Sequence, residues 1–420
     1  MLEDMSSRPD WAEHLIAWHT YPLGQLGAPM TPQGLDAPVE HRLPRLEHWL
    51  GHIQELGCSG LLLGPVLASR SHGYDTLDHY RVDPRLGDGA DLDSLVSAAH
   101  SHGLKVLLDG VFNHVSWHHR LVQDALAAGP ETPQGRMIRW RQGADGPEPD
   151  VFEGHGDLVA LNHDEPEVSR MVTDVMNHWS ARGIDGWRLD AAYAVPPAFW
   201  STVLPRVRSQ HPGTWVFGEV IHGDYPGIVA TSGMDSVTQY ELWKAIWSSI
   251  ASRNFFELDH ALERHDMFGS AFPPMTFIGN HDVTRIASQV GEDGAVLALA
   301  VLMTVGGVPS IYYGDEYGYR GVKEDRVGGD DQIRPVLPDS PQGMELGAQM
   351  LRTHRELIGL RRRHPWLIDA RTEKEALSNE RYVYRTGVPG VEPLIAEFDL
   401  TDRPWAVIRE AGDVIWEYHS

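Results

Sequence analysis

Three acidic residues of this 420-residue chain, Asp190, Glu219 and Asp282, each lie at the end of a short apolar segment. Such segments are typical of buried parallel strands, whose carboxyl ends meet at one face of a sheet or barrel. We therefore expect the three side chains to share one cleft. Three carboxylates in one cleft suit the cleavage of an acetal: one attacks the anomeric carbon, and a second, kept protonated, protonates the leaving oxygen. When the reaction retains the anomeric configuration, these two groups lie about 5 Å apart.

Arg188 stands two residues before Asp190, so on a strand the two side chains project from the same face. A guanidinium in that position would keep Asp190 ionised and oriented, as a nucleophile requires. The alternative is a structural Arg–Asp ion pair inside the fold. The presence of Glu219 and Asp282 at matching strand ends favours the first interpretation.

The apolar pattern around these residues predicts helices that alternate with short strands. Apolar residues recur at steps of three and four, and each such stretch is followed by a glycine and a short apolar segment. The helical stretches lie within 43–56, 92–99 and 168–179, and the strands after them at 61–63, 105–108 and 184–189. Further strands are expected at 14–18, 214–217, 234–237, 275–278 and 308–312. Eight strands alternating with helices predict an α/β fold, a (β/α)8 TIM barrel rather than an open doubly wound sheet.

Two segments depart from this alternation of helices and strands, and they predict the domain organisation. Residues 113–157 are rich in Gly, Pro and polar residues, so we expect a small inserted subdomain after the third strand. After residue 365 the pattern becomes that of short β-strands, which predicts a short C-terminal β-domain over 366–420. The catalytic barrel is then expected to comprise residues 1–112 and 158–365.

Composition limits the partners of the chain. There are 35 Lys and Arg against 59 Asp and Glu, a formal net charge of −24, which disfavours nucleic acids and anionic lipids but leaves neutral substrates open. The single cysteine, Cys58, excludes an internal disulfide, and the longest apolar run, Ala295–Met303, is too short to span a bilayer. The N-terminus lacks the basic and apolar regions of a signal peptide. We therefore expect a cytoplasmic protein with no membrane partner, and the oligomeric state stays open.

At this point the chain resembles the α-amylase family, glycoside hydrolase family 13. The motifs that carry the resemblance occur in the family's order: GPV at 64–66, HGYD at 72–75, DGVFNH at 109–114, GWRLD at 186–190, GEV at 218–220, FIGNHD at 277–282 and GVPSIYYGDE at 307–316. The resemblance implies that Asp190 is the nucleophile and Glu219 the acid and base. Asp282 would stabilise the transition state.

The resemblance also implies residues that bind the sugar. Tyr74 would stack under the ring that undergoes cleavage, and His114 and His281 would bind its hydroxyl groups. Asp75 and Arg334 would together clamp a glucose at the non-reducing end, which favours action from chain ends. The alternative for Arg334 is an arginine in a surface loop.

The sequence departs from the calcium-dependent members of the family. Asp190 is followed by Ala191-Ala-Tyr-Ala194, where those members carry a Lys-His pair. Asn113 alone cannot form a calcium cage, which takes six to eight oxygen ligands. The histidine-rich stretch 113–119 lacks the carboxylate or cysteine spacing of a metal site. We therefore expect no metal and no cofactor.

These observations favour a retaining hydrolase that cleaves α-glucosidic bonds in short α-glucans or oligosaccharides, which are neutral substrates. A transglycosylase or isomerase with the same site is the first alternative, because the choice depends on how well the acceptor side excludes water. A non-catalytic carbohydrate-binding scaffold is the second, but it would not need all three carboxylates.

Overall fold

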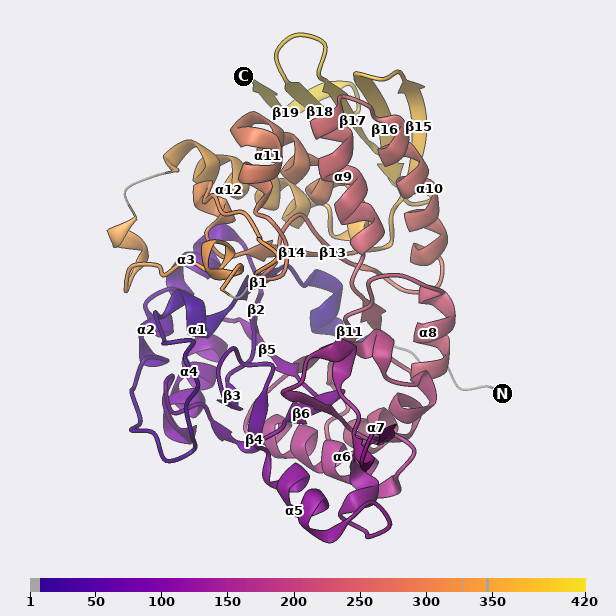
Figure 1. Cartoon of the computed structure of the whole chain (residues 1–420). Coiled ribbons are helices and arrows are strands. Elements are labelled where there is room, and N and C mark those ends of the chain that lie inside the picture. The colour runs from indigo at the N-terminus through magenta and orange to yellow at the C-terminus, as the bar shows by residue number, and fades with distance from the viewer. Residues whose placement is uncertain (1–7, 327, 345–346) are drawn as a thin grey trace.

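A computed structural model describes residues 8–326, 328–344 and 347–420, and its centre is a ring of eight parallel strands (Figure 1). The strands are β1 (Ala17–Thr20), β2 (Gly60–Leu63), β5 (Lys105–Gly110), β10 (Gly186–Leu189), β11 (Trp215–Gly218), β12 (Ser236–Val237), β13 (Met275–Phe277) and β14 (Val308–Tyr312). Their order in the sheet is β12-β11-β10-β5-β2-β1-β14-β13. An isolated parallel bridge between Thr238 and Met275 joins the two end strands. The expected (β/α)8 barrel is therefore confirmed.

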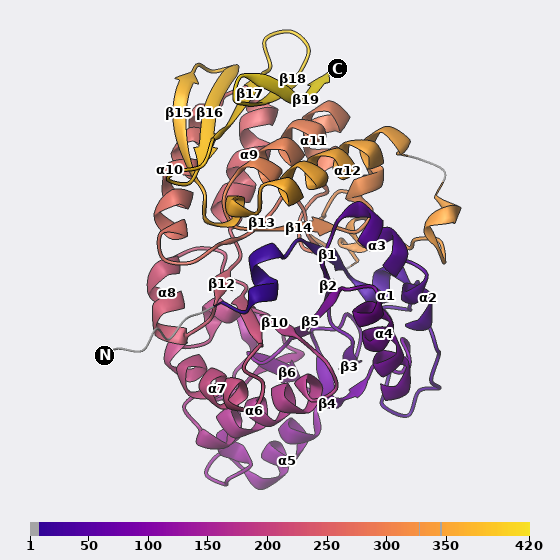
Figure 2. The ribbon, with the colours of Figure 1, turned by 180° about the vertical axis from the view of Figure 1, so that it is seen from behind.

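Helices surround the ring, as Figures 1 and 2 show from opposite sides. They are α1 (Pro22–Gln25), α2 (Pro44–Glu47), α3 (Leu50–Leu56), α4 (Gly89–Ser101), α6 (Pro166–Ser180), α7 (Pro197–Gln210), α8 (Tyr225–Ser232), α9 (Tyr240–Ser252), α10 (Phe256–Gly269), α11 (Ile286–Thr304) and α12 (Ala348–Arg363). The single helix expected over 43–56 is divided into α2 and α3. The amide of Trp49 bonds the carbonyl of Leu46, three residues back, which tightens the turn between them.

Helix α11 lies against α9 and α12 and contributes much of the core. Among the described residues it is the one helix whose length and composition would allow it to cross a membrane. However, 67% of its most apolar stretch is buried inside the protein. Gly291 has non-helical angles, with φ +77°, so the regular part of the helix is shorter than its 19 residues.

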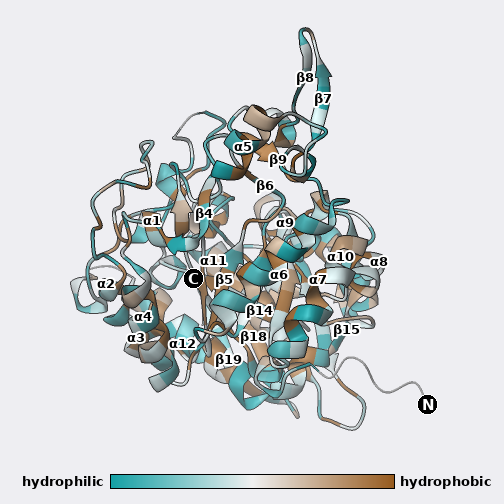
Figure 3. Cartoon of the chain, turned by 90° about the horizontal axis from the view of Figure 1, so that it is seen from below, coloured by the Kyte–Doolittle hydropathy of each residue, from teal (hydrophilic) through white to brown (hydrophobic). Residues whose placement is uncertain are grey.

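The segment between β5 and β10 holds small elements of its own. These are β6 (His114–Ser116), α5 (Arg120–Ala128), β7 (Trp140–Gly143), β8 (Gly146–Pro149) and β9 (Leu158–Ala160). β6 pairs with β9, and the β7–β8 hairpin projects from the body of the molecule (Figure 3). Because β9 pairs back onto β6, residues 158–160 are tied to this segment, and the boundary at residue 157 stays a prediction. A second hairpin, β3 (Leu67–Ser69) with β4 (Thr76–Val82), follows β2.

The C-terminal part is an antiparallel sheet of five strands in sequential order. They are β15 (Arg371–Leu377), β16 (Arg381–Gly387), β17 (Leu394–Asp399), β18 (Trp405–Glu410) and β19 (Asp413–His419). The sheet packs on α10 and α11 (Figure 2), and the hydroxyl groups of Tyr384 and Thr304 lie 2.7 Å apart across that contact. The sequence pattern predicts four of these strands, at 381–385, 393–398, 405–408 and 414–418. β15 was missed because its sequence, RTEKEAL, is charged and it forms a half-exposed edge of the sheet.

The close contact of β14 with its neighbour predicts a sharp requirement for glycine at residue 307. Gly307 has φ +97°, and a Cβ there would lie 2.4 Å from the carbonyl oxygen of Pro274. We expect Gly307→Ala to lower the free energy of unfolding by about 3 kcal/mol, because backbone strain and a backbone clash add. Gly103→Ala is the matched control: Gly103 has φ +74° but no atom within 4 Å, so about 1 kcal/mol is expected. Urea unfolding measures both variants, and equal losses of unfolding free energy in the two would contradict the role of the backbone clash at Gly307.

Candidate active site

One guanidinium group brings the expected catalytic carboxylates together. Nη1 of Arg188, on β10, lies 2.7 Å from Asp109 and 3.4 Å from Oδ1 of Asp190, and its Nη2 lies 2.8 Å from Oε1 of Glu219. All four residues are buried. Because both carboxylates contact the same guanidinium, Asp190 and Glu219 lie on the same wall of the site, close to each other.

The strand register explains why the closest partners of Arg188 differ from the expected one. Arg188 is paired with Asp109 across β5 and β10, and β11, which Glu219 follows, pairs on the other side of β10. The shortest contacts of the guanidinium are therefore to Asp109 and Glu219. Asp190, two residues further along, makes the longer contact. Arg188 orients three carboxylates rather than Asp190 alone.

The turn after Asp190 directs a backbone donor toward Glu219. Ala191 has φ +46° and ψ +36°, a left-handed conformation that costs a non-glycine residue about 1 kcal/mol. In that conformation its N–H donates to Oε2 of Glu219 over 3.0 Å. The hydroxyl of Tyr240 donates to the other oxygen, Oε1, over 3.3 Å. Glu219 is thus held by three donors from three directions.

Asp282 lies at the mouth of the same site, and its side chain is 30% exposed. Arg334 Nη2 is 3.0 Å from its Oδ1, and His281 Nε2 is 2.8 Å from its Oδ2. The side chain of Asn280 accepts the amide hydrogen of Asp282 and donates to the hydroxyl of Tyr240. Asn280 therefore connects the loop of Asp282 to the partners of Glu219.

The pKa values of Asp190 and Asp282 are shifted in opposite directions. Burial raises the pKa of Asp190 well above its usual value, the carboxylate of Glu219 raises it further, and Arg188 opposes both. Burial also favours a higher pKa for Asp282, but His281, Arg334 and Arg188 outweigh it and hold that pKa well below its usual value. Asp282 consequently stays charged over the whole range in which Asp190 titrates.

A stack of three rings lies beside the acidic groups. The ring of His281 lies between Tyr74 and Tyr21, with centroids 5.4 Å and 5.8 Å away and nearly parallel planes. The hydroxyl of Tyr74 donates to Asp109 over 2.9 Å, and burial raises its pKa well above the usual value, so the phenol stays neutral. The guanidinium of Arg334 lies 4.5 Å from the centre of the Tyr21 ring.

Three of the expected sugar-binding residues are engaged with protein atoms. His114 Nε2 lies 3.0 Å from the carbonyl of Tyr74, and burial lowers the pKa of His114 to about 4, so the ring is neutral at neutral pH. The carboxylate of Asp75 accepts hydrogen bonds from the backbone and hydroxyl of Ser71. Arg334 is nearly buried and bonds Asp282, so it is not a surface-loop arginine. No ion pair joins Asp75 to Arg334, both of which are described, and their clamp stays a prediction.

Arg285 is a further buried residue that organises this face of the barrel. Its Nη1 donates to the carbonyl of Tyr313 and to Asp315, and its Nη2 donates to the carbonyl of Ile333. Arg285 is three residues after Asp282, and Ile333 directly precedes Arg334. The one guanidinium thus ties the loop of Asp282 to the loop of Arg334.

Four residues of the site were not predicted from the sequence. Asp109 and Asn280 lie inside the recognised motifs but were given no role. Tyr21 and Tyr240 stand in no motif, and only the closed barrel brings them to the site.

Among the residues that the structure describes, the site shows no cage for a metal ion. The side-chain amide of Asn113 lies 3.1 Å from Nδ1 of His114 rather than facing other oxygen ligands. Within the described ranges, possible ligands gather at one place, His41, Asp88 and Asp91, where the carboxylates bond backbone amides at the start of α4. The expected absence of a metal stays a prediction.

Known proteins resemble the chain in both sequence and fold. It is 29% identical over 392 residues to a maltogenic alpha-amylase of Bacillus acidopullulyticus and 30% identical over 389 residues to neopullulanase 2 of Thermoactinomyces vulgaris. These alignments cover 87% and 86% of the chain but 65% and 64% of the two relatives, so the chain spans less than two thirds of their length.

Solved structures share the architecture over almost the whole chain. A debranching enzyme of Nostoc punctiforme, from acarbose-soaked crystals, superposes with a TM-score of 0.76 at 26% identity, covering 96% of this chain and 92% of that one. A cyclic α-maltosyl-(1→6)-maltose hydrolase of Arthrobacter globiformis reaches a TM-score of 0.81 at 21% identity, over 99% and 100%, which shows the fold alone. The family model "Alpha amylase, catalytic domain" matches residues 46–376, well over half of the chain, and the protein therefore belongs to the α-amylase family.

Proposed function

We propose that the protein is a retaining hydrolase that cleaves α-glucosidic bonds in short α-glucans or oligosaccharides. The observation that carries this proposal is the contact of Asp190 and Glu219 with the single guanidinium of Arg188. Two carboxyl groups that contact one guanidinium lie close together, as in retaining enzymes, whereas inverting enzymes need a wider gap that admits a water molecule. The close arrangement favours a covalent intermediate over direct attack by water.

In the proposed mechanism, a carboxylate oxygen of Asp190 attacks the anomeric carbon while Glu219 gives its proton to the leaving oxygen. The resulting glucosyl ester on Asp190 is opened by water, whose proton passes to Glu219. Asp282 carries negative charge throughout, which stabilises the positive charge that develops on the sugar. Tyr74, neutral and stacked on His281, supplies a flat face for the ring.

The class of substrate rests on the chemistry of the site and on the names of the relatives. The acidic chain repels anions, so a neutral glycan is the expected substrate. The relatives are named maltogenic amylase, neopullulanase and cyclomaltodextrinase, all terms for action on α-glucans. Action on short substrates from a chain end rests on the predicted clamp of Asp75 and Arg334. The proposal includes an intracellular site of action, as in the relative named intracellular maltogenic amylase from Bacillus subtilis.

The direct test is a substrate panel read by proton NMR, with maltose, isomaltose, panose, trehalose, sucrose and starch. The proposal expects turnover of short α-glucosides, with the α-anomer as the first product. A β-anomer formed first would contradict retention. New oligosaccharides as the main products in excess maltose would instead support the transglycosylase, and no turnover of any sugar would support the binding scaffold.

The position of Arg285 predicts a loss of turnover from a residue that cannot touch the substrate. We expect Arg285→Lys to lower kcat by about 10- to 100-fold with little change in KM, because Asp282 and Arg334 shift together by a fraction of an ångström. Arg264→Lys is the matched control, since Arg264 pairs with Glu241 on the outer helices. Parallel losses of kcat in both variants, or an unchanged kcat in Arg285→Lys, would contradict the positioning role.

A further inference from the structure

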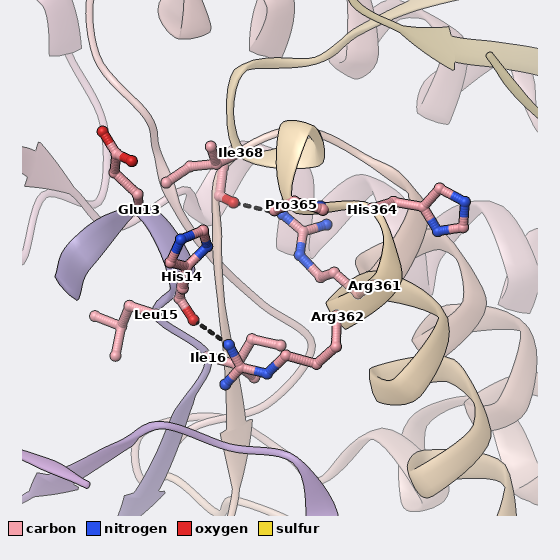
Figure 4. Close-up of a pocket in the computed structure, with 10 residues that line it drawn as sticks. Glu13, His14, Leu15, Ile16, Arg361, Arg362, His364, Pro365 and Ile368 are labelled. Carbon is pink, nitrogen blue, oxygen red and sulfur yellow. Dashed lines mark hydrogen bonds between the residues drawn. The ribbon is translucent and has the colours of Figure 1, made fainter. Parts of the chain in front are cut away.

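A cavity of about 30 Å³ lies at the amino ends of β1 and β14, the opposite end of the barrel from the catalytic residues (Figure 4). Its lining combines apolar side chains with two consecutive arginines at the end of α12. The lining residues include Glu13, His14, Ile16, Gly307, Arg361 and Arg362. Nothing in the proposed reaction uses this cavity.

Arg361 is 5% exposed and caps the end of a helix. Its Nη1 donates to the carbonyl oxygens of Met303 and Val305, at the carboxyl end of α11, and its Nη2 donates to that of Gly307. The partial negative charge of a helix end favours a cation there. The helix end supplies only a fraction of a unit negative charge, so it does not neutralise the guanidinium of Arg361.

Arg362 brings a second guanidinium to the same cavity. Its Nε donates to the carbonyl of Gly57 over 2.6 Å, and its Nη1 donates to the carbonyl of His14. Neither Nε of Arg361 nor Nη2 of Arg362 has a hydrogen-bond acceptor among the residues that the structure describes. Two guanidinium groups therefore border one cavity, and each has an N–H group without an acceptor among the described residues.

The absence of a carboxylate distinguishes Arg361 from the other buried arginines, and Arg362 beside it is half-buried. Arg85, Arg188 and Arg285 each lie within 2.7 Å of an aspartate oxygen. In the described part of the chain, Arg361 and Arg362 form no ion pair. Glu13 lines the cavity, but its carboxylate points away from both guanidinium groups (Figure 4).

A buried charge without a counter-ion is costly. Burial and the charge of Arg362 lower the pKa of Arg361 to about 9, in accord with an uncompensated pair of cations. A small anion in the cavity would offset this repulsion and accept the spare N–H groups.

We infer that the cavity between Arg361 and Arg362 binds a small inorganic anion of the size of chloride. The volume of about 30 Å³ holds about two water-sized groups, so a halide fits. The bound anion would connect the segment before β1 with the end of α12. Binding would therefore stabilise the closure between the first and last elements of the barrel.

Thermal unfolding at constant ionic strength tests this site with chloride as the probe. Replacing 200 mM gluconate by 200 mM chloride is expected to raise the Tm of the wild type by about 2 °C. The shift should disappear in Arg362→Gln, while hydrolytic kcat below the transition stays unchanged. Arg206→Gln is the matched control, because Arg206 is exposed on α7 and makes no ion pair. Equal Tm values of the wild type in both salts would overturn the inference.

Two further measurements keep the inference testable if Arg362→Gln does not fold. Crystals of the wild type soaked in bromide should show an anomalous peak between the two guanidinium groups, and empty density there would overturn the site. The variant Glu13→Gln distinguishes a bound anion from the carboxylate of Glu13 as the counter-ion. The chloride shift should persist in that variant. A wild type insensitive to chloride, with sensitivity appearing only in Glu13→Gln, would assign the counter-ion to Glu13 instead.

Discussion

Replacing Asp190 by asparagine is expected to lower kcat for hydrolysis of short α-glucosides by roughly 10⁴-fold or more. The amide is nearly isosteric with the carboxylate but cannot form the glucosyl ester. Water would then have to attack the sugar directly, without the wider gap between carboxyl groups that inverting enzymes need. Steady-state kinetics on a chromogenic α-glucoside measures the loss.

The fold should tolerate this change, because Arg188 keeps Asp109 and Glu219 as its closer partners. Far-UV circular dichroism and a Tm close to that of the wild type would verify this. Asp235→Asn is the matched control: Asp235 pairs with Arg208 before β12, at the opposite end of the barrel. That variant should lose stability but keep its kcat. Activity of Asp190→Asn within 10-fold of the wild type would remove Asp190 from the role of nucleophile.

The barrel could be predicted because most of its strands can be recognised from their local sequence. Most of the eight are short apolar runs, several of them after a helical pattern or a glycine, and buried parallel strands require that composition. β15 lacks it, since an edge strand with a solvated face can be charged. The break between α2 and α3 was missed because three-residue turns inside an amphipathic stretch leave its apolar spacing almost unchanged.

The candidate site could be predicted only as far as chain position determines it. Asp190, Glu219 and Asp282 follow strands, so their convergence follows from the barrel. The partners of Arg188 depend on which residue of β5 stands opposite, and no spacing within one strand contains that information. The left-handed conformation of Ala191 could not be predicted either, because a positive φ is expected at glycine and not at alanine.

The second large effect is expected from Glu219→Gln, and it should depend on the leaving group. For a maltooligosaccharide, kcat/KM should fall about 10³- to 10⁴-fold, because the departing sugar oxygen needs a proton. For an α-glucosyl fluoride, whose leaving group needs none, formation of the glucosyl ester should be far less affected. Added azide should then restore turnover and yield an α-glucosyl azide. A uniform loss on both substrates would contradict the role of Glu219 as the acid.

The same variant should change the pH dependence of the reaction in one direction. Asp190 must be ionised to attack, so kcat/KM falls as the pH drops through its pKa, which burial and then the charge of Glu219 place above the usual value. Glutamine removes that neighbouring charge and lowers the pKa. The acid limb of kcat/KM for the fluoride should therefore move to lower pH in Glu219→Gln. A limb that moves upward would contradict the repulsion between the two carboxylates, whereas a limb that stays in place would show that Glu219 is already protonated while Asp190 titrates.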